Sequence, residues 1–110
     1  MNTFELSKIL TRIFNNLGNK LILKKYKIEE PFNFRTYVRE VKHEEIDGPY
    51  DYIVEVYSDR PMPRTLIDRE KNERYDLNFV NYDFKELLKY IDPSLKKTVK
   101  IVFQDVDPFK

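Results

Sequence analysis

The apolar residues near the amino terminus recur every three or four positions, which is the spacing of one helical face. The series consists of Leu6, Ile9, Leu10, Ile13, Phe14 and Leu17. Gly18 follows directly and can supply the left-handed residue that ends a helix. The pattern therefore predicts an amphipathic helix over residues 3–17.

From Lys20 onward the apolar positions alternate with polar ones, as they do along half-buried strands. The alternation predicts strands over residues 20–28, 32–44 and 50–57. Pro31 separates the first strand from the second, because proline cannot donate to a strand ladder. The sequence Asp47-Gly48-Pro49 is typical of a turn and predicts a hairpin between the second and third strands.

The second half of the chain predicts a loop, a hairpin, a helix and a last strand. Two prolines one residue apart make residues 58–64 an exposed loop. Residues 65–79 are interpreted as a protruding hairpin, although residues 64–75 would also suit a polar helix. Asp83 and Glu86 form a capping box for a helix that ends at Ile91, and alternation over residues 99–104 predicts the last strand.

This order of elements predicts one α+β domain over residues 1–110. Two helices are expected to pack on one face of a mainly antiparallel sheet, with the hairpin protruding. A chain of 110 residues has the length of a single domain.

Composition excludes several classes of function. Lys and Arg number 20 against 19 Asp and Glu, so the formal net charge is only +1 and names no polyanionic partner. The chain has no cysteine, and its two glycines stand far apart, which excludes thiolate chemistry and glycine-rich phosphate loops. No secretion signal and no apolar run of membrane-spanning length are present, so we expect no membrane association.

The residues also lack a pattern typical of catalysis. His43 is the single histidine, and its charged neighbours indicate a solvated strand end. No nucleophile stands with an orienting base, and no ligand spacing indicates a metal. We therefore expect a protein that is not an enzyme and that holds no metal or cofactor.

Charge is segregated along the chain. Residues 20–42 contain seven basic and three acidic side chains, a net of +4, whereas residues 43–59 contain six acidic and no Lys or Arg side chains. One interpretation is nucleic-acid binding, in which basic residues contact phosphates beside aromatic residues that stack on bases. Its candidate contacts are Lys24, Lys25, Lys27, Arg35 and Arg39. The other interpretation is a head-to-tail contact between copies of the chain, which fits the segregation better.

Two exposed segments are candidates for protein contacts. The 58–64 loop combines stiff prolines with long side chains suited to docking, namely those of Arg60, Met62 and Arg64. The tip of the predicted hairpin is entirely polar and consists of Glu70, Lys71, Asn72 and Glu73.

In element order and size the chain resembles the small tail-terminator and head-to-tail connector proteins of tailed bacteriophages. The resemblance lies in the 3–17 helix, the turn at Asp47-Gly48-Pro49, the 66–79 hairpin and the 83–91 helix. It implies a structural subunit of an oligomeric ring at the neck or tail of a virion, assembled in the bacterial host cytoplasm. Copies of the chain and other virion proteins would be its partners. The alternative function is a small phage or bacterial regulator that binds nucleic acid or a host protein through residues 20–42.

Overall fold

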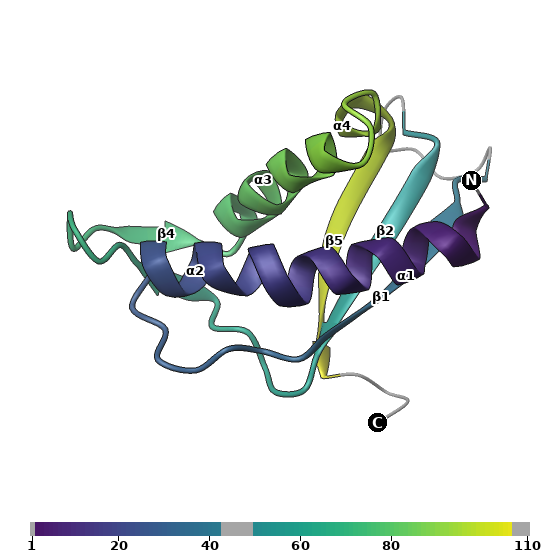
Figure 1. Cartoon of the computed structure of the whole chain (residues 1–110). Helices are drawn as coiled ribbons and strands as arrows, with labels where there is room; N and C mark the ends of the chain where they lie inside the picture. Colours follow the sequence, from purple (N-terminus) through teal and green to yellow (C-terminus); the bar gives the residue numbers. More distant parts are fainter. Residues whose placement is uncertain (1, 43–49, 107–110) are drawn as a thin grey trace.

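The computed structural model describes residues 2–42 and 50–106, which form a three-stranded sheet, a small hairpin and several helices (Figure 1). The helical elements are α1 (Thr3–Ile13), the π turn η1 (Phe14–Gly18), α2 (Asn19–Lys25), α3 (Asn78–Leu87), the 3-10 turn η2 (Leu88–Tyr90) and α4 (Leu95–Thr98). The strands are β1 (Phe34–Glu40), β2 (Tyr52–Ser58), β3 (Thr65–Ile67), β4 (Arg74–Asp76) and β5 (Val99–Val106). The turn predicted at residues 46–49 and the single histidine, His43, lie outside the described residues.

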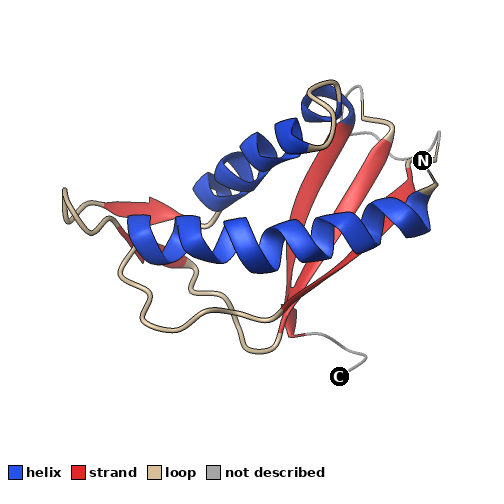
Figure 2. Ribbon diagram, viewed as in Figure 1, coloured by secondary structure: helices blue, strands red, loops and turns tan. Residues whose placement is uncertain are grey.

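The main sheet has the order β1-β2-β5. Strands β1 and β2 are antiparallel, whereas β5 returns through α3 to lie parallel to β2. Helix α3 packs on one face of this sheet, as the ring contacts of Phe84 with Phe34 in β1 and Phe103 in β5 show. The long amino-terminal helix, formed by α1, η1 and α2, lies on the same side (Figure 2), where the Phe14 ring is 4.7 Å from that of Phe84. The predicted α+β class is thus confirmed, with helices on one face.

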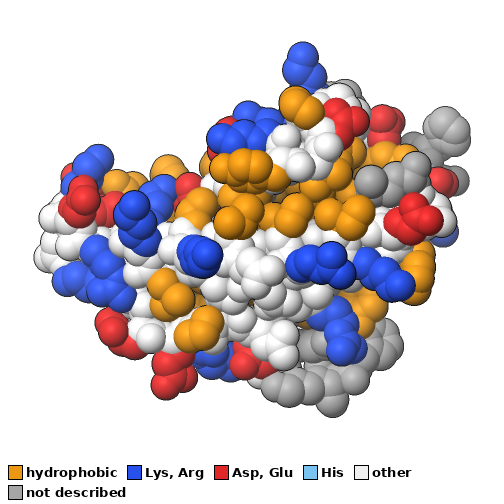
Figure 3. Space-filling view, viewed as in Figure 1, with side chains coloured by type: hydrophobic (Ala, Val, Ile, Leu, Met, Phe, Trp, Pro, Cys, Tyr) orange, Lys and Arg blue, Asp and Glu red, His pale blue; other side chains and the backbone are white. Residues whose placement is uncertain are grey.

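The core lies between the sheet and these helices. Alternate residues of each strand face it, as the alternation in the sequence predicts for β1, β2 and β5. The fully or nearly buried residues of these three strands are Phe34, Thr36, Val54, Val56, Ser58, Val99 and Ile101. Figure 3 shows a band of apolar side chains along the seam between α1 and α3, where the core reaches the surface.

The prediction that the first helix ends at Gly18 and that a strand follows is wrong. Gly18 has a right-handed backbone (φ −61°), and the helix continues to Lys25. A Cβ atom at position 18 would lie 2.8 Å from Cζ of Phe84, so the glycine is needed for close packing against α3. The 20–28 segment therefore buries Ile22 and Tyr26 because they stand four residues apart on one helical face.

The second predicted helix is longer than its capping box indicates. Helix α3 begins at Asn78, so Asp83 lies within the helix and does not cap it. Its carboxylate instead accepts hydrogen bonds from residues of the long helix. Phe84, Leu87 and Leu88 are buried as the spacing predicts.

The predicted hairpin is confirmed, with shorter strands than expected. Strands β3 and β4 pair in antiparallel fashion and project past the end of α2 (Figure 1). The 59–64 segment before them is an irregular loop, as its prolines predict. None of the helices in the described part of the chain has the length and apolar character of a membrane span.

Candidate functional site

The 58–64 loop is anchored to the core. The Arg60 guanidinium lies 3.9 Å from the centroid of the Phe32 ring and donates to the carbonyl oxygens of Glu30 and Pro31 at 2.7 and 2.9 Å. Met62 is only 6% exposed and belongs to the core. The prediction that Met62 is a docking side chain is therefore wrong, and Arg60 has a structural role in holding the loop.

The hairpin tip is exposed, as predicted, and its turn is well defined. One carboxylate oxygen of Asp68 accepts the backbone N–H groups of Lys71 and Glu70 at 2.8 Å each, and these bonds lower the pKa of Asp68. Asn72 adopts a left-handed backbone (φ 56°), which asparagine tolerates well. The polar side chains of residues 70–73 are all exposed, and their role in assembly remains a prediction.

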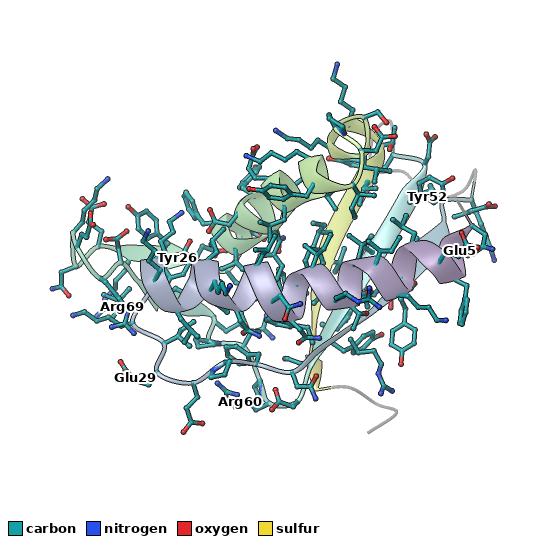
Figure 4. All side chains as sticks on the ribbon, viewed as in Figure 1. Glu5, Tyr26, Glu29, Tyr52, Arg60 and Arg69 are labelled. Atoms are coloured by element: carbon teal, nitrogen blue, oxygen red, sulfur yellow. The ribbon has the colours of Figure 1, made fainter. Side chains whose placement is uncertain are left out.

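Arg69 ties the base of the hairpin to the long helix (Figure 4). Its side chain donates to the carbonyl oxygens of Leu23 and Ile28 at 2.8 and 2.7 Å, and its backbone N–H donates to the carbonyl of Lys25. The carbonyl groups at the end of a helix lack helical partners and favour a cation. The hairpin thus has a fixed direction relative to α2.

The five basic residues that could contact nucleic acid are divided between two places. Lys25 pairs with Asp83 at 2.9 Å, and Lys27 donates to the Oδ1 atom of Asn72 at the hairpin tip. Arg35 instead lines a hollow beside α1, and Arg39 pairs with Glu55 in β2. Lys24 is exposed on α2. The structure thus places the three lysines at the end of α2 and the two arginines on β1.

A buried tyrosine and a carboxylate connect α2 to α3. The hydroxyl of Tyr26 donates to Asp83 at 2.6 Å, and the tyrosine side chain is fully buried (Figure 4). Burial, and next the hydrogen bond to Asp83, raise the pKa of Tyr26. The phenol is consequently protonated near neutral pH and acts as a hydrogen-bond donor that holds α3 in place.

A polar stripe of the long helix covers the outer edge of β1. Its four members recur every fourth residue and are Ser7, Thr11, Asn15 and Asn19. Each side chain accepts one backbone N–H group, and the four donors are every second residue of the adjacent segment: Val38, Thr36, Phe34 and Phe32, in that order. An edge strand normally exposes these groups, so the helix replaces a neighbouring strand here.

The two asparagines reproduce the bonds that a strand would make. Asn15 accepts from the backbone N–H of Phe34 at 2.6 Å and donates to the carbonyl of the same residue at 2.8 Å. Asn19 makes the same pair of bonds with Phe32, both at 2.8 Å. An amide side chain has a carbonyl acceptor and two N–H donors, so the acceptor and one donor match a peptide group while the second donor bonds to a helix carbonyl, that of Thr11 or Asn15.

The spacing of helix and strand makes this match repeat. Four helical residues rise about 6 Å, and two strand residues rise about 6.6 Å. A stripe with a four-residue period winds by about 40° per step around an ideal helix, which would turn Asn19 away from the strand. The π turn, in which the N–H of Asn19 bonds to the carbonyl of Phe14, reverses part of this drift.

The opposite edge of the sheet has no such cover in the described residues. The even-numbered residues of β1 direct their backbone N–H groups to the long helix. The backbone hydrogen bonds between β1 and β2 are therefore made by the odd-numbered residues of both strands. The even-numbered residues of β2 direct their backbone groups to β5. Val54 lies opposite Ile101 in the parallel pair and therefore bonds to the two residues that flank Ile101. Ile101 and Phe103 direct their backbone N–H and C=O groups outward, and no described strand lies beyond β5.

A slot runs along this open edge beneath α3. We define the slot by two adjoining hollows of about 250 and 430 Å³, which share Asn78, Asn81, Lys100 and Ile101. The Oδ1 atom of Asn81 is buried there and has no hydrogen-bond partner. A buried carbonyl oxygen without a partner is costly, so it marks a place where a donor is missing.

Within the described residues, no group of His, Asp and Glu side chains is arranged to hold a metal ion.

The open edge had no signal in the sequence, because alternation does not reveal which strand ends a sheet. The polar stripe at positions 7, 11, 15 and 19 did have a signal in the sequence, namely its four-residue period.

No family model, curated protein or solved structure matches the chain.

Proposed function

We propose that the protein is a non-enzymatic assembly subunit, and that it joins a partner protein by accepting an added strand at the open edge of β5. The observation that supports this most is the contrast between the two edges: the long helix covers β1, whereas no element in the described part of the chain covers β5. Strand addition uses main-chain bonds for affinity and side-chain pockets for specificity.

The widths of the two layers support the same proposal. Two packed helices span about 18–22 Å, whereas three strands span about 14 Å. The helices therefore extend beyond the sheet. Figure 1 shows α3 beside β5, on the side away from β2.

A ring subunit of a phage neck or tail, as the resemblance implies, is one form of this function. In such a ring, a neighbouring copy or another virion protein would supply the added segment. Direct pairing of β5 with β1 of the next copy is not available, because α1 already occupies that edge. The expected ring contacts through strand edges are thus restricted to β5, together with the exposed hairpin tip.

The test is the nuclear magnetic resonance spectrum of the labelled protein with an added peptide. The probe is a capped peptide of alternating Thr and Val, with the eight-residue length of β5. We expect shifts at the amides of Ile101 and Phe103 and none at Phe34 or Val38. Absence of shifts at β5, or shifts confined to β1, would overturn the proposal.

A matched pair of substitutions provides the control. Asn81→Arg fills the slot without changing β5, and Asn16→Arg makes the same chemical change at an exposed position of the long helix. The first should abolish the peptide-induced shifts, and the second should leave them intact.

A further inference from the structure

We infer that the solvent side of the long helix binds single-stranded nucleic acid, with cations on the phosphates and an exposed phenylalanine ring against a base. This surface is separate from the open edge of β5, so the inference goes beyond the proposed function. Of the five basic residues that the sequence suggests for nucleic-acid contact, only Lys24 belongs to it.

Every fourth residue of the long helix forms an exposed row on its solvent side. The row stands one position beyond the polar stripe that binds β1, and it stays exposed along its whole length. Four residues rise about 6 Å in a helix, so the cations of the row extend over about 24 Å. Figure 3 shows Lys and Arg side chains along this helix, beside the apolar band. The members of this basic row are Phe4, Lys8, Arg12, Asn16, Lys20 and Lys24.

The four cations of the basic row have no acidic partners. Across residues 2–42 and 50–106, none of the four forms an ion pair. Lys25, which lies beside the row, instead pairs with Asp83 at 2.9 Å. Residues 2–26 contain five Lys and Arg side chains and one acidic side chain, that of Glu5, although the formal net charge of the whole chain is only +1. The fold thus gathers positive charge on one side of the long helix, and this charge favours a polyanion.

A hollow of about 630 Å³ lies beside the first half of the basic row, between α1 and β1. Phe4, Lys8 and Arg12 line it together with Arg35 and Tyr37, and none of the described residues that line it is acidic. The side chain of Phe4 is 67% exposed, and Nζ of Lys8 lies 4.7 Å from its ring centroid. Single-strand binders combine a cationic surface of this kind with aromatic rings on which bases stack.

The composition of the row favours a nucleic acid over other anionic partners. Between Lys8 and Lys24 the row has no apolar side chain, so a membrane surface would gain charge contacts there without burying apolar area. A run of carboxylates offers no ring to Phe4, and a duplex keeps its base faces stacked on each other. A single strand offers both phosphates and free base faces.

The test is the fluorescence anisotropy of labelled oligonucleotides with the intact protein. They have about twelve nucleotides, within the range that single-strand modules cover. Thymidine and uridine oligonucleotides are both used, because phosphate and stacking contacts are common to DNA and RNA, and binding of either supports the inference. Four phosphate contacts predict that the logarithm of the association constant falls with the logarithm of salt concentration with a slope of about −3.

Charge variants test the row. Arg12→Gln combined with Lys20→Gln removes two contacts, so we expect binding to weaken about tenfold or more and the slope to fall to about −1.5. Lys71→Gln combined with Lys97→Gln removes the same charge from exposed positions of the hairpin tip and α4, and should change neither quantity. Asn16→Arg fills the gap in the row, so it should tighten binding and steepen the slope by about 0.7.

Phe4→Leu tests the ring separately from the charge. We expect binding to weaken about fivefold or more with an unchanged salt slope, since a stacking contact is lost and no phosphate contact is. Tyr82→Leu removes a similarly exposed ring from α3 and should have no effect.

The outcomes separate this inference from the proposed function. Tighter binding of a duplex would overturn the choice of a single strand, and equal competition by polyglutamate or by vesicles of anionic phospholipid would overturn the choice of a nucleic acid. No binding, or binding that the row variants leave unchanged, would overturn the inference as a whole. None of these results bears on the peptide-induced shifts at Ile101 and Phe103, which test strand addition by themselves.

Discussion

The two edges of the sheet differ in how their backbone groups are treated. At β1, three side chains of the long helix bond to the strand and a fourth bonds to Phe32 just before it, so an incoming strand would have to displace them. At β5, Ile101 and Phe103 present outward peptide groups beside a buried, unpartnered Asn81 oxygen. Proteins commonly protect exposed edges against unwanted pairing. Among the described residues, only the β1 edge has such a cover, and this contrast is the basis for proposing that the β5 edge accepts a partner strand.

The largest expected effect comes from removing the buried member of the polar stripe, which holds the segment just before β1. Asn19→Ala would leave the buried N–H and C=O groups of Phe32 without partners, at a cost of about 1–3 kcal/mol for each group. We expect the free energy of unfolding to fall by about 3 kcal/mol in urea denaturation. The matched change at the exposed Asn16 should alter it by less than about 0.5 kcal/mol. Equal effects of the two substitutions would show that the stripe does not hold the edge.

Gly18→Ala tests the contact that places α3 over β5. Alanine stabilises an ordinary helical position by about 0.5–1 kcal/mol relative to glycine. Here the new Cβ atom would meet the Phe84 ring at 2.8 Å, so we expect a loss of about 2 kcal/mol in stability. Phe84→Leu should reduce the cost of Gly18→Ala in a double-mutant cycle. A stabilised Gly18→Ala variant would contradict the close packing.

Tyr26→Phe tests the hydrogen bond that ties α3 to α2. Loss of a bond to a carboxylate should cost about 1.5 kcal/mol, whereas Tyr90→Phe at an exposed position should cost almost nothing. Because folding raises the pKa of Tyr26 above its unfolded value of about 10, its contribution is complete below that pH. Stability should decrease as pH rises above that value, and the decrease should be smaller in Tyr26→Phe. An identical alkaline profile for both proteins would exclude this role of Tyr26.

The smallest expected effect has the opposite sign. Asn81→Leu removes an oxygen that is buried without a partner, so the isolated protein should become more stable by about 1 kcal/mol. Peptide binding at β5 should become weaker in the same variant. A gain in stability with a loss of binding identifies a binding residue, whereas destabilisation of the isolated protein would indicate that Asn81 serves the fold alone.

The sequence predicts the fold class better than it predicts the surfaces. Alternation correctly places the buried residues of β1, β2 and β5, because each of these strands has one face against the core. The same reasoning fails at residues 20–28, because apolar residues at positions 22 and 26 satisfy both a strand and a helical period. Gly18 continues the helix and packs closely against Phe84, and this contact joins residues that are far apart in the chain, so local patterns do not reveal it.

The candidate site was less accessible to prediction than the fold. Met62 and Arg60 stand in an exposed loop by composition, yet tertiary contacts bury the first and engage the second. The open edge of β5 depends on the order of strands, which local patterns do not encode. Asn81 has no distinguishing neighbours in the sequence, and only its place beside β5 makes it a candidate.

The most direct test of the contrast between the edges is hydrogen exchange of individual amides in the isolated protein. We expect slow exchange at Phe34, Thr36 and Val38, whose N–H groups bond to the long helix. We expect exchange at Ile101 and Phe103 to be faster by about a hundredfold or more, since an amide without an acceptor needs no opening of the fold. Equal protection of the two sets would contradict the claim that β5 is the open edge.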